Sequence, residues 1–282
     1  MVTKMLEALY VIASRKDIPA GGRVRLLFAF FWLSVRRKFI RNTESVPFLG
    51  YRIFFRTYEN LLTILKEVFL FGEYRPLTVG QNPFIIDCGG NIGITTLFFK
   101  QRFPGSNILV FEPLNGNCQI IRKNIEGNRL QGVRVVEAAV GSSEGTITFW
   151  EDAKKPGSST AVEEVVGTKG EHRFQKVNVS SVQLSTYIDR DVDLLKMDIE
   201  GGEGIVFEEL DRSGAMRRIR EIVFEYHVNP KNSSNNLSKI VAILERNGFK
   251  LIPGGSDLVL KGDSMLLKAS FHYLIHAVNT TN

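Results

Sequence analysis

The sequence predicts an α/β protein built on a mostly parallel sheet. From Pro83 onward, short apolar runs rich in Ile, Val and Phe alternate with amphipathic segments of helical length, which is typical of repeated strand–helix units. Several of these runs end in acidic residues or glycines, as strands do where open α/β sheets bind ligands. A chain of 282 residues, 44% hydrophobic and 23% charged, can bury a large core, which excludes a disordered or collagen-like protein.

The sequence before Pro83 predicts helices in residues 1–45, then one strand and then a further helix. Residues 1–45 are expected to be helical, and their apolar run Leu26–Val35 is flanked by Arg and Lys. That run is about half of the roughly 20 residues that a membrane-spanning helix needs. A strand is expected at Tyr51–Phe55. A helix is predicted over Asn60–Phe71, because one face would carry Leu61, Leu65, Val68 and Phe69.

The regular part of the chain is predicted to alternate strands and helices. The expected strands are Phe84–Asp87, Ile108–Glu112, Val133–Ala138, Leu194–Asp198, Glu221–Tyr226, Phe249–Ile252 and Ser270–Ile275. The expected helices are Ile94–Arg102, Asn115–Asn124, Glu203–Leu210 and Leu237–Arg246. Thr146–Trp150 and Val177–Val179 indicate a hairpin, and the polar segment Glu151–Lys176 between them predicts a loop long enough to act as a lid. Residues Asn279–Asn282 are expected to fray.

The net charge of +6 is concentrated at the N-terminus. Nine basic and three acidic side chains lie in residues 1–50, so the other 232 residues carry 27 of each sign. Two interpretations of residues 1–45 stay open: a helix packed on the main domain, or an interfacial helix on an anionic membrane. The distribution does not predict a nucleic-acid groove.

The two cysteines and the absence of a secretory pattern favour a reducing compartment. Cys88 and Cys118 form neither a disulfide framework nor a metal-binding spacing. The apolar run also begins too far from Met1 to resemble a signal peptide. We therefore expect a cytoplasmic protein, and the interfacial interpretation would add peripheral contact with the inner face of the membrane.

A glycine-rich turn follows the first strand of the regular part. Residues 84–93 read FIIDCGGNIG, and Gly and Asn at such a turn let the backbone approach a nucleotide or nucleoside closely. The dinucleotide fingerprint G-x-G-x-x-G is absent because Ile94 stands where its last glycine is required. Asp87 before the glycines suits a ligand with a positive charge. Glu112 ends the next strand, 23 positions after Gly89, where an acid binds ribose hydroxyls in nucleotide-binding units.

Two later strands end in acidic residues and a histidine. Asp198 ends one strand and Glu200 follows it, whereas Glu225 lies in an otherwise apolar strand and His227 comes just beyond it. Because the carboxyl ends of parallel strands share one sheet edge, we expect these groups to meet. Asp198 and His227 are the candidates for a general base, and Glu200 and Glu225 would orient the base or the substrate.

The same four groups raise the question of a metal. They could converge on a divalent ion, but no spacing such as H-x-x-x-H fixes two ligands on one element, so a metal is not favoured. On the metal-free interpretation, activity is expected to rise with pH through the titration of His227, whose reference pKa is about 6.5.

The motifs taken together resemble the FkbM-type S-adenosylmethionine-dependent methyltransferases. The matching segments are Phe71–Tyr74, Ile86–Gly93, Phe111–Pro113, Ala138–Gly141, Leu195–Glu203 and Phe224–His227, and they fall in order within residues 50–275. The resemblance implies a class I methyltransferase (Rossmann-like) domain over residues 50–282, with helices on both faces of the sheet and a C-terminal antiparallel strand. Residues 1–49 would be a basic helical extension.

The resemblance also implies a reaction and a cofactor site. The reaction would be O-methylation of a hydroxyl on a small-molecule natural product, a sugar or a glycan. By position, the methionine part of S-adenosylmethionine would be lined by Asp87, Gly89, Asn91 and Gly93, the ribose would be bound by Glu112, and adenine would be flanked by Glu137, Ala138 and Ala139. Gly90, Pro113 and Asp198 are counted with the same cofactor site.

Two alternatives to a methyltransferase remain at this stage. A nicotinamide-dependent oxidoreductase or epimerase shares the strand–helix unit and the ribose-binding acid, but the missing glycine counts against it. A non-catalytic cofactor-binding scaffold recruited to membranes would use the basic N-terminus. The acids present at every expected strand end count against that interpretation.

Overall fold

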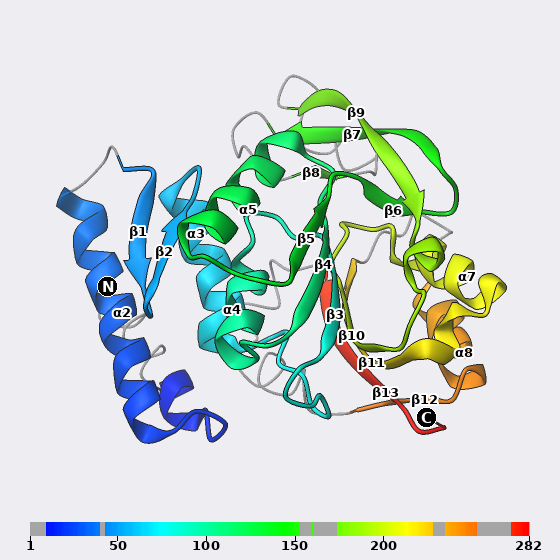
Figure 1. Ribbon diagram of the computed structural model, residues 1–282, viewed down its shortest axis with the longest axis horizontal. Coiled ribbons are helices and arrows are strands. Elements are labelled where there is room, and N and C mark those ends of the chain that lie inside the picture. Colours follow the sequence, from blue (N-terminus) through cyan, green and yellow to red (C-terminus); the bar gives the residue numbers. More distant parts are fainter. Residues whose placement is uncertain are drawn as a thin grey trace.

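A seven-stranded sheet forms the centre of the protein (Figure 1). The computed structural model describes residues 10–39, 43–152, 159–160, 174–227, 235–252 and 272–281. The strand order is β12-β13-β11-β10-β3-β4-β5. The bounds are β3 Phe84–Cys88, β4 Asn107–Phe111, β5 Val133–Val136, β10 Val192–Met197, β11 Ile219–His227, β12 Phe249–Leu251 and β13 His272–Asn279.

The sheet is parallel except at β13, as the sequence predicts. β5, β4, β3, β10 and β11 pair in parallel, whereas β13 runs antiparallel to both β11 and β12. Along the sequence, β4 and β5 are added on one side of β3, and β10 is then added on its other side. The order therefore reverses between β3 and β10, where open α/β sheets form a crevice at the carboxyl ends of their strands.

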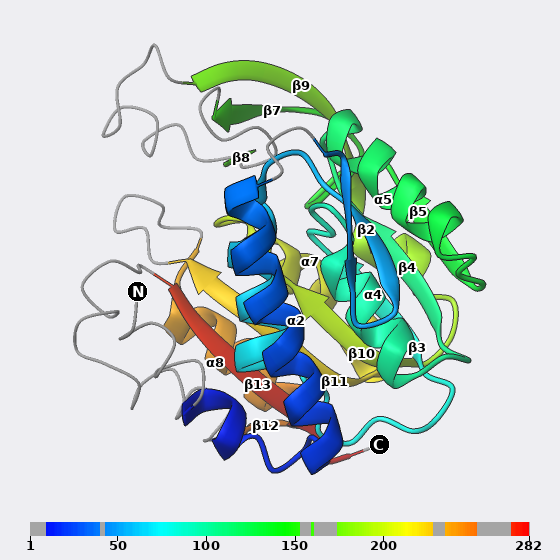
Figure 2. The same ribbon diagram turned by 90° about the vertical axis from the view of Figure 1, so that its left-hand side faces the viewer.

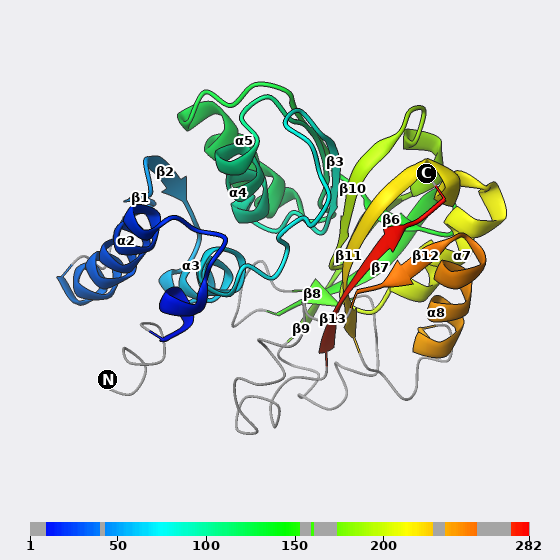
Figure 3. The ribbon, with the colours of Figure 1, turned by 90° about the horizontal axis from the view of Figure 1, so that it is seen from below.

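Helices cover both faces of this sheet (Figure 3). The helical bounds are α2 Ala20–Phe39, α3 Tyr58–Leu65, α4 Ile94–Arg102, α5 Asn115–Gly127, α7 Glu203–Ser213 and α8 Leu237–Arg246, with short helical segments at Lys66–Phe71 (η1), Leu184–Tyr187 (η3) and Ala215–Arg218 (η4). α4 buries Leu97 and Phe99 in a core on one face of the sheet. α7 buries Val206 and Phe207 in a second core on the other face.

A second sheet is inserted between β5 and β10. Its order is β6-β9-β7-β8, with β6 Ala139–Gly141, β7 Gly145–Asp152, β8 Ser159–Thr160 and β9 Phe174–Gln183. The predicted hairpin is confirmed, because β7 and β9 pair antiparallel.

The predicted loop over 151–176 is wrong at both ends. The β7–β9 ladder continues to Asp152 opposite Phe174, and the Lys176 ammonium lies 4.5 Å from the ring centroid of Trp150. Polar residues on a solvent-facing hairpin do not prevent strand pairing, so polarity alone placed the loop ends wrongly. Residues 153–158 and 161–173 of the expected lid lie outside the described residues.

The N-terminal segment packs on the domain through one face of α2. Leu26, Phe30 and Leu33 are buried in the same core as residues of β3 and β4, which confirms the packed-helix interpretation for that face. Helix is expected to residue 45, but residues 40–42 are not described and a hairpin of β1 (Ser45–Phe48) and β2 (Tyr51–Phe54) begins at Ser45. Its turn uses positive φ angles at Leu49 and Gly50. Among the described ranges, no helix combines the length and apolarity needed to cross a bilayer.

The helix expected over residues 60–71 changes its winding midway. α3 ends at Leu65, and η1 continues as a π-helix to Phe71. The buried Arg15 guanidinium donates to the carbonyl oxygens of Phe69 (3.3 Å) and Leu70 (2.9 Å), which satisfies the end of this wide turn. Gly72 follows at φ 69°, and a Cβ there would lie 2.4 Å from Arg15. Periodicity predicts a helix here but carries no signal for this tertiary contact.

A buried ion pair crosses the reversal point of the sheet. Lys196 of β10 lies opposite Asp87 of β3 in the ladder, and Nζ is 3.1 Å from Oδ1 with both side chains at most 1% exposed. The same ammonium donates to the carbonyl oxygen of Gly89 at 2.7 Å. The first glycine turn is thereby tied to the neighbouring strand.

Removing one partner of this pair should be strongly destabilising. Asp87→Ala leaves Lys196 buried without its carboxylate, so the free energy of unfolding in urea should fall by about 3–5 kcal/mol. The double variant Asp87→Leu with Lys196→Met should recover most of that loss. Glu137→Ala, which breaks the exposed pair with Arg122, should cost at most about 1 kcal/mol. Equal losses for Asp87→Ala and Glu137→Ala would contradict a structural role for the buried pair.

Candidate active site

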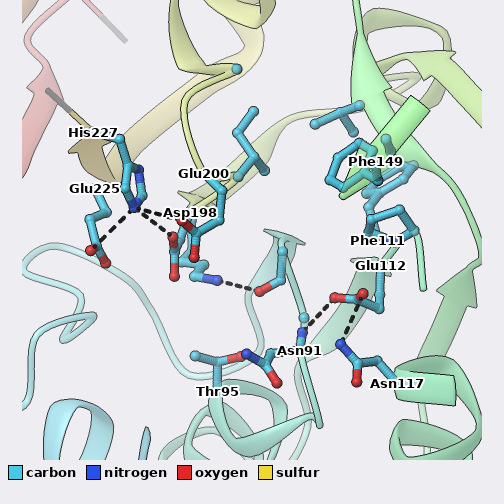
Figure 4. A pocket seen from close by; sticks show the side chains of 18 of the residues that line it. Asn91, Thr95, Phe111, Glu112, Asn117, Phe149, Asp198, Glu200, Glu225 and His227 are labelled. Carbon is cyan, nitrogen blue, oxygen red and sulfur yellow. Dashed lines mark hydrogen bonds and ion pairs between the residues drawn. The ribbon is translucent and has the colours of Figure 1, made fainter. Parts of the chain in front are cut away.

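A cavity of about 470 Å³ opens at the carboxyl edge of the main sheet (Figure 4). Its volume is in the range of small-molecule sites. The walls come from the ends of β3, β4, β10 and β11, from α3 and η1, and from the second sheet. One wall carries the glycine turn and Glu112, and the opposite wall carries Asp198, Glu200, Glu225 and His227.

The glycine turn is held against two strands. Gly89 has φ 84°, and a Cβ at this position would lie 1.8 Å from the carbonyl oxygen of Asp198. The N–H groups of Gly89 and Gly90 both donate to the carbonyl oxygen of Phe111, at 2.9 and 3.0 Å. Only glycine permits this approach at position 89. The turn exposes backbone to the cavity, together with the Asn91 side chain.

Glu112 is a buried part of the cavity wall. It is 4% exposed, and it accepts hydrogen bonds from the N–H groups of Asn91 (2.8 Å) and Leu114 (3.0 Å) and from Nδ2 of Asn117 (3.2 Å). Burial raises the pKa of Glu112 to about 7, against the lowering effect of these bonds. The carboxyl group therefore shapes the glycine turn in addition to facing the cavity.

The structure separates the residues assigned to the cofactor site into two groups. The residues that line the cavity are Gly89, Gly90, Asn91, Glu112, Pro113, Ala138, Ala139 and Asp198. Asp87, Gly93 and Glu137 are not among its lining residues. Asp87 lies beneath the turn against Lys196 and Thr95, and Gly93 caps α4. Glu137 points to the exposed pair with Arg122, which carries it away from the cavity.

The acidic wall brings together all four predicted catalytic residues. Nε2 of His227 lies 3.5 Å from Glu225, 3.6 Å from Glu200 and 3.8 Å from Asp198. Glu200 adopts φ 57°, an uncommon conformation for a residue with a side chain. Such strained residues concentrate at functional sites.

A tyrosine connects two of these carboxyl groups. The Tyr74 hydroxyl lies 3.1 Å from Asp198 and 3.0 Å from Glu225. Burial, together with the charge of Asp198, raises the pKa of Glu225 well above its usual range. Because a phenol has a single hydrogen, the arrangement is satisfied when protonated Glu225 donates to Tyr74 and Tyr74 donates to Asp198.

The expectation that His227 titrates near its ordinary pKa is wrong. Burial alone would lower this pKa, but a 3.0 Å contact between Nδ1 and the buried Glu203 carboxylate, together with the charges of Glu200 and Asp198, raises it to about 11. Glu203 is itself held by the N–H of Gly201 and by Nδ2 of Asn235. His227 is therefore an imidazolium at neutral pH and cannot accept a proton there.

Several residues of the site carry no role in the sequence-based assignment. Glu67 and Glu73 line the cavity beside Tyr74. Burial raises the pKa of Glu67 to about 8 and that of Glu73 to about 7, with further contributions from neighbouring acids. Tyr74 and Glu73 stand in the F-G-E-Y motif, and Glu203 ends the E-G-G-E motif. These two motifs could have singled out the three residues from the sequence, but a motif does not show which partner each side chain contacts.

Asp198, Glu200 and His227 are the residues that could hold a metal ion. One ligand atom from each lies within 4.8 Å of the others, and carboxylate with imidazole suits a divalent ion. A protonated His227 already supplies one positive charge among these carboxylates. The cluster can therefore be balanced by a proton as well as by a cation.

The fold and the cavity together define a class of enzyme. A sheet in this order, with antiparallel β13 between β11 and β12 and a glycine turn at the reversal point, is the class I methyltransferase (Rossmann-like) architecture. The sequence model described as "Methyltransferase FkbM domain" matches residues 87–251, more than half of the chain. The chain belongs to this family and is a methyltransferase.

Two curated relatives are also methyltransferases by name. "Methyltransferase sdnD" of Sordaria araneosa is 31% identical over 216 residues, which cover 67% of this chain and 82% of that protein. "Methyltransferase 1" of Beauveria bassiana is 30% identical over 165 residues, or 52% of this chain and 66% of that protein. A solved FkbM methyltransferase from Methylobacillus flagellatus is 15% identical with a TM-score of 0.45, covering 90% of this chain and 59% of that one. The chain thus spans about three fifths of the length of that solved protein.

The charge state of His227 can be observed directly. In NMR spectra of protein labelled at histidine, the ring of His227 should show the imidazolium form from about pH 6 to about pH 9. His276 is the internal control, because burial lowers its pKa, the opposite direction to the shift of His227. Glu203→Gln should lower the pKa of His227 by removing its main partner. A His227 midpoint near pH 6.5 in the unmodified protein would contradict this electrostatic arrangement.

Proposed function

We propose that the protein transfers the methyl group of S-adenosylmethionine to a hydroxyl of a neutral sugar, glycan or natural product. The observation that carries the proposal is the single cavity that joins the glycine turn and Glu112 to the acidic wall around Asp198. A methyl donor on one wall would thereby face an acceptor on the other. Family membership favours this function over the nicotinamide-dependent alternative.

The cofactor would occupy the wall formed by β3 and β4. The space above Gly89, which a Cβ would fill, would take the methionine part. Oδ1 of Asn91 is buried without a hydrogen-bond partner among the described residues, so it can accept from the cofactor. Glu112 would accept from the ribose hydroxyls, and Ala138 and Ala139 would lie beside adenine. The bound cofactor supplies a sulfonium-activated methyl group.

The acidic wall would position the acceptor and remove its proton. As the bond between the acceptor oxygen and the methyl carbon forms and the carbon–sulfur bond breaks, the Asp198 carboxylate would take the hydroxyl proton. Positioning alone can lower the barrier by about 7–11 kcal/mol. Tyr74 orients Asp198, and the His227 imidazolium holds the surrounding carboxylates in place. His227 thus moves from a candidate base to a charged positioning residue.

The hydrogen-bonding groups of the wall support a neutral, hydroxyl-bearing acceptor. Asp198 and Glu200 line the cavity beside Glu225, Glu67 and Glu73, and the raised pKa values of these last three acids let them donate as well as accept hydrogen bonds. Carboxylate oxygens accept hydrogen bonds from hydroxyl groups, whereas phosphates and carboxylates on an acceptor would be repelled. Sugars and polyhydroxylated natural products fit this wall better than anionic metabolites.

Two variants should separate the roles of the two walls. Asp198→Asn should lower kcat by about 10²–10⁴-fold and, because Asp198 lies beside the glycine turn, should weaken the affinity for S-adenosylmethionine in titration calorimetry to a smaller degree. Glu112→Gln should instead weaken that affinity by about tenfold or more, since each charge-assisted hydrogen bond contributes about 1.5–3 kcal/mol. Methyl transfer is to be measured on a panel of neutral sugars, glycans and natural products. If the protein binds S-adenosylmethionine but methylates none of these acceptors, the non-catalytic scaffold is favoured. If it does not bind S-adenosylmethionine, the proposed cofactor is wrong.

The reaction is proposed to proceed without a metal, because no spacing such as H-x-x-x-H fixes two ligands on one element. Activity should survive exhaustive dialysis against a chelator, and titration with magnesium should give no binding heat. Loss of activity with the chelator and its return with magnesium or manganese would overturn this. Asp198, Glu200 and His227 would then be ligands.

A further inference from the structure

The outward face of α2 carries an apolar stripe. Its side chains repeat at helical spacing and include two phenylalanines and a tryptophan. Val24 is 52% exposed, Phe28 68%, Phe31 57%, Trp32 40% and Val35 40%. The opposite face of the same helix buries Leu26, Phe30 and Leu33. Core packing therefore does not explain the five exposed apolar residues of this helix.

The stripe lies on the outside of the molecule. In Figures 1 and 2, α2 is the outermost element on its side, and the rest of the domain lies behind it. Monomeric proteins rarely expose a continuous run of large apolar side chains unless it meets a partner. Single exposed hydrophobics such as Leu77 or Leu251 on other elements form no comparable row.

Basic side chains border the stripe. At about 100° per residue, Arg25 and Arg36 fall on the same edge of the stripe, near its two ends. The guanidinium of Arg36 lies 4.7 Å from the ring centroid of Trp32. Among residues 10–39 the single acid is Asp17, which is already paired with Arg15 and Arg75. Helix α2 itself therefore carries basic and no acidic side chains.

These observations identify the partner by its chemistry. We propose that this face, defined as the α2 stripe of residues Val24, Phe28, Phe31, Trp32 and Val35 with Arg25 and Arg36 beside it, binds the surface of an anionic lipid bilayer. Aromatic side chains enter the headgroup boundary, and the flanking arginines meet lipid phosphates and carboxylates. A second copy of the chain fits less well, because a two-fold contact would bring the arginines of two helices together without acids to oppose them.

Vesicle binding by the full chain tests the proposal. The protein should sediment with phosphatidylcholine vesicles that contain phosphatidylserine and bind poorly to pure phosphatidylcholine, with binding weakened by salt. Phe28→Ser with Phe31→Ser should reduce the partition at least tenfold, and Arg25→Glu should reduce it on anionic vesicles. Leu77→Ser with Leu251→Ser is the matched control and should bind like the unmodified protein. In a Trp150→Phe background, the fluorescence of Trp32 should shift to shorter wavelength on binding.

Three results would overturn the proposal. Failure of the unmodified chain to bind anionic vesicles excludes a lipid partner, and so does binding that survives Phe28→Ser with Phe31→Ser. A dimer in light scattering that this double variant converts to a monomer would assign the stripe to a second copy. Unchanged thermal unfolding and cofactor affinity in the variant show that a loss of vesicle binding comes from the surface and not from misfolding.

Discussion

The buried contact between Lys196 and Asp87 organises both walls of the cavity. An ammonium ion inside the sheet is costly unless a carboxylate and further acceptors surround it. Lys196 finds Asp87 on the next strand and the carbonyl oxygens of Cys88 and Gly89 above it. Its ammonium also lies 5.0 Å from the ring centroid of Tyr74. One charge thus contacts the glycine turn on one wall of the cavity and, on the other, the aromatic ring whose hydroxyl lies 3.1 Å from Asp198.

The acidic wall is arranged under the same constraint, which is that a buried charge needs a partner of opposite sign. Asp198 lies beside the glycine turn, and Glu225 and His227 come from the adjacent strand. Carboxylates this close can coexist only if some are protonated or a cation lies among them. The raised pKa of Glu225 and the imidazolium of His227 provide both solutions at once. Glu203, buried behind His227, determines which ring nitrogen faces the cavity.

The sequence predicted what depends on local pattern and missed what depends on distant partners. α4 and α8 match their predicted bounds because both show helical spacing between clear ends. The meeting of Asp198 with His227 was predictable because both follow parallel strands. The charge of His227 was not predictable, because it depends on Glu203, which lies on another element. The same holds for Glu112, whose position at a strand end indicates a ligand contact but not its burial under three donors.

The inserted sheet has a consequence for how this enzyme can diversify. β7 and β9 reach the cavity through Ile147, Phe149 and Ser181, yet they pair with no strand of the main sheet. Their side chains pack with Leu114 and Ala139 in a small core around Phe149 and Val179. Substitutions in this hairpin can reshape the cavity while leaving the Lys196 ion pair untouched. The residues that shape this part of the cavity and the residues that stabilise the main sheet therefore lie in different parts of the chain.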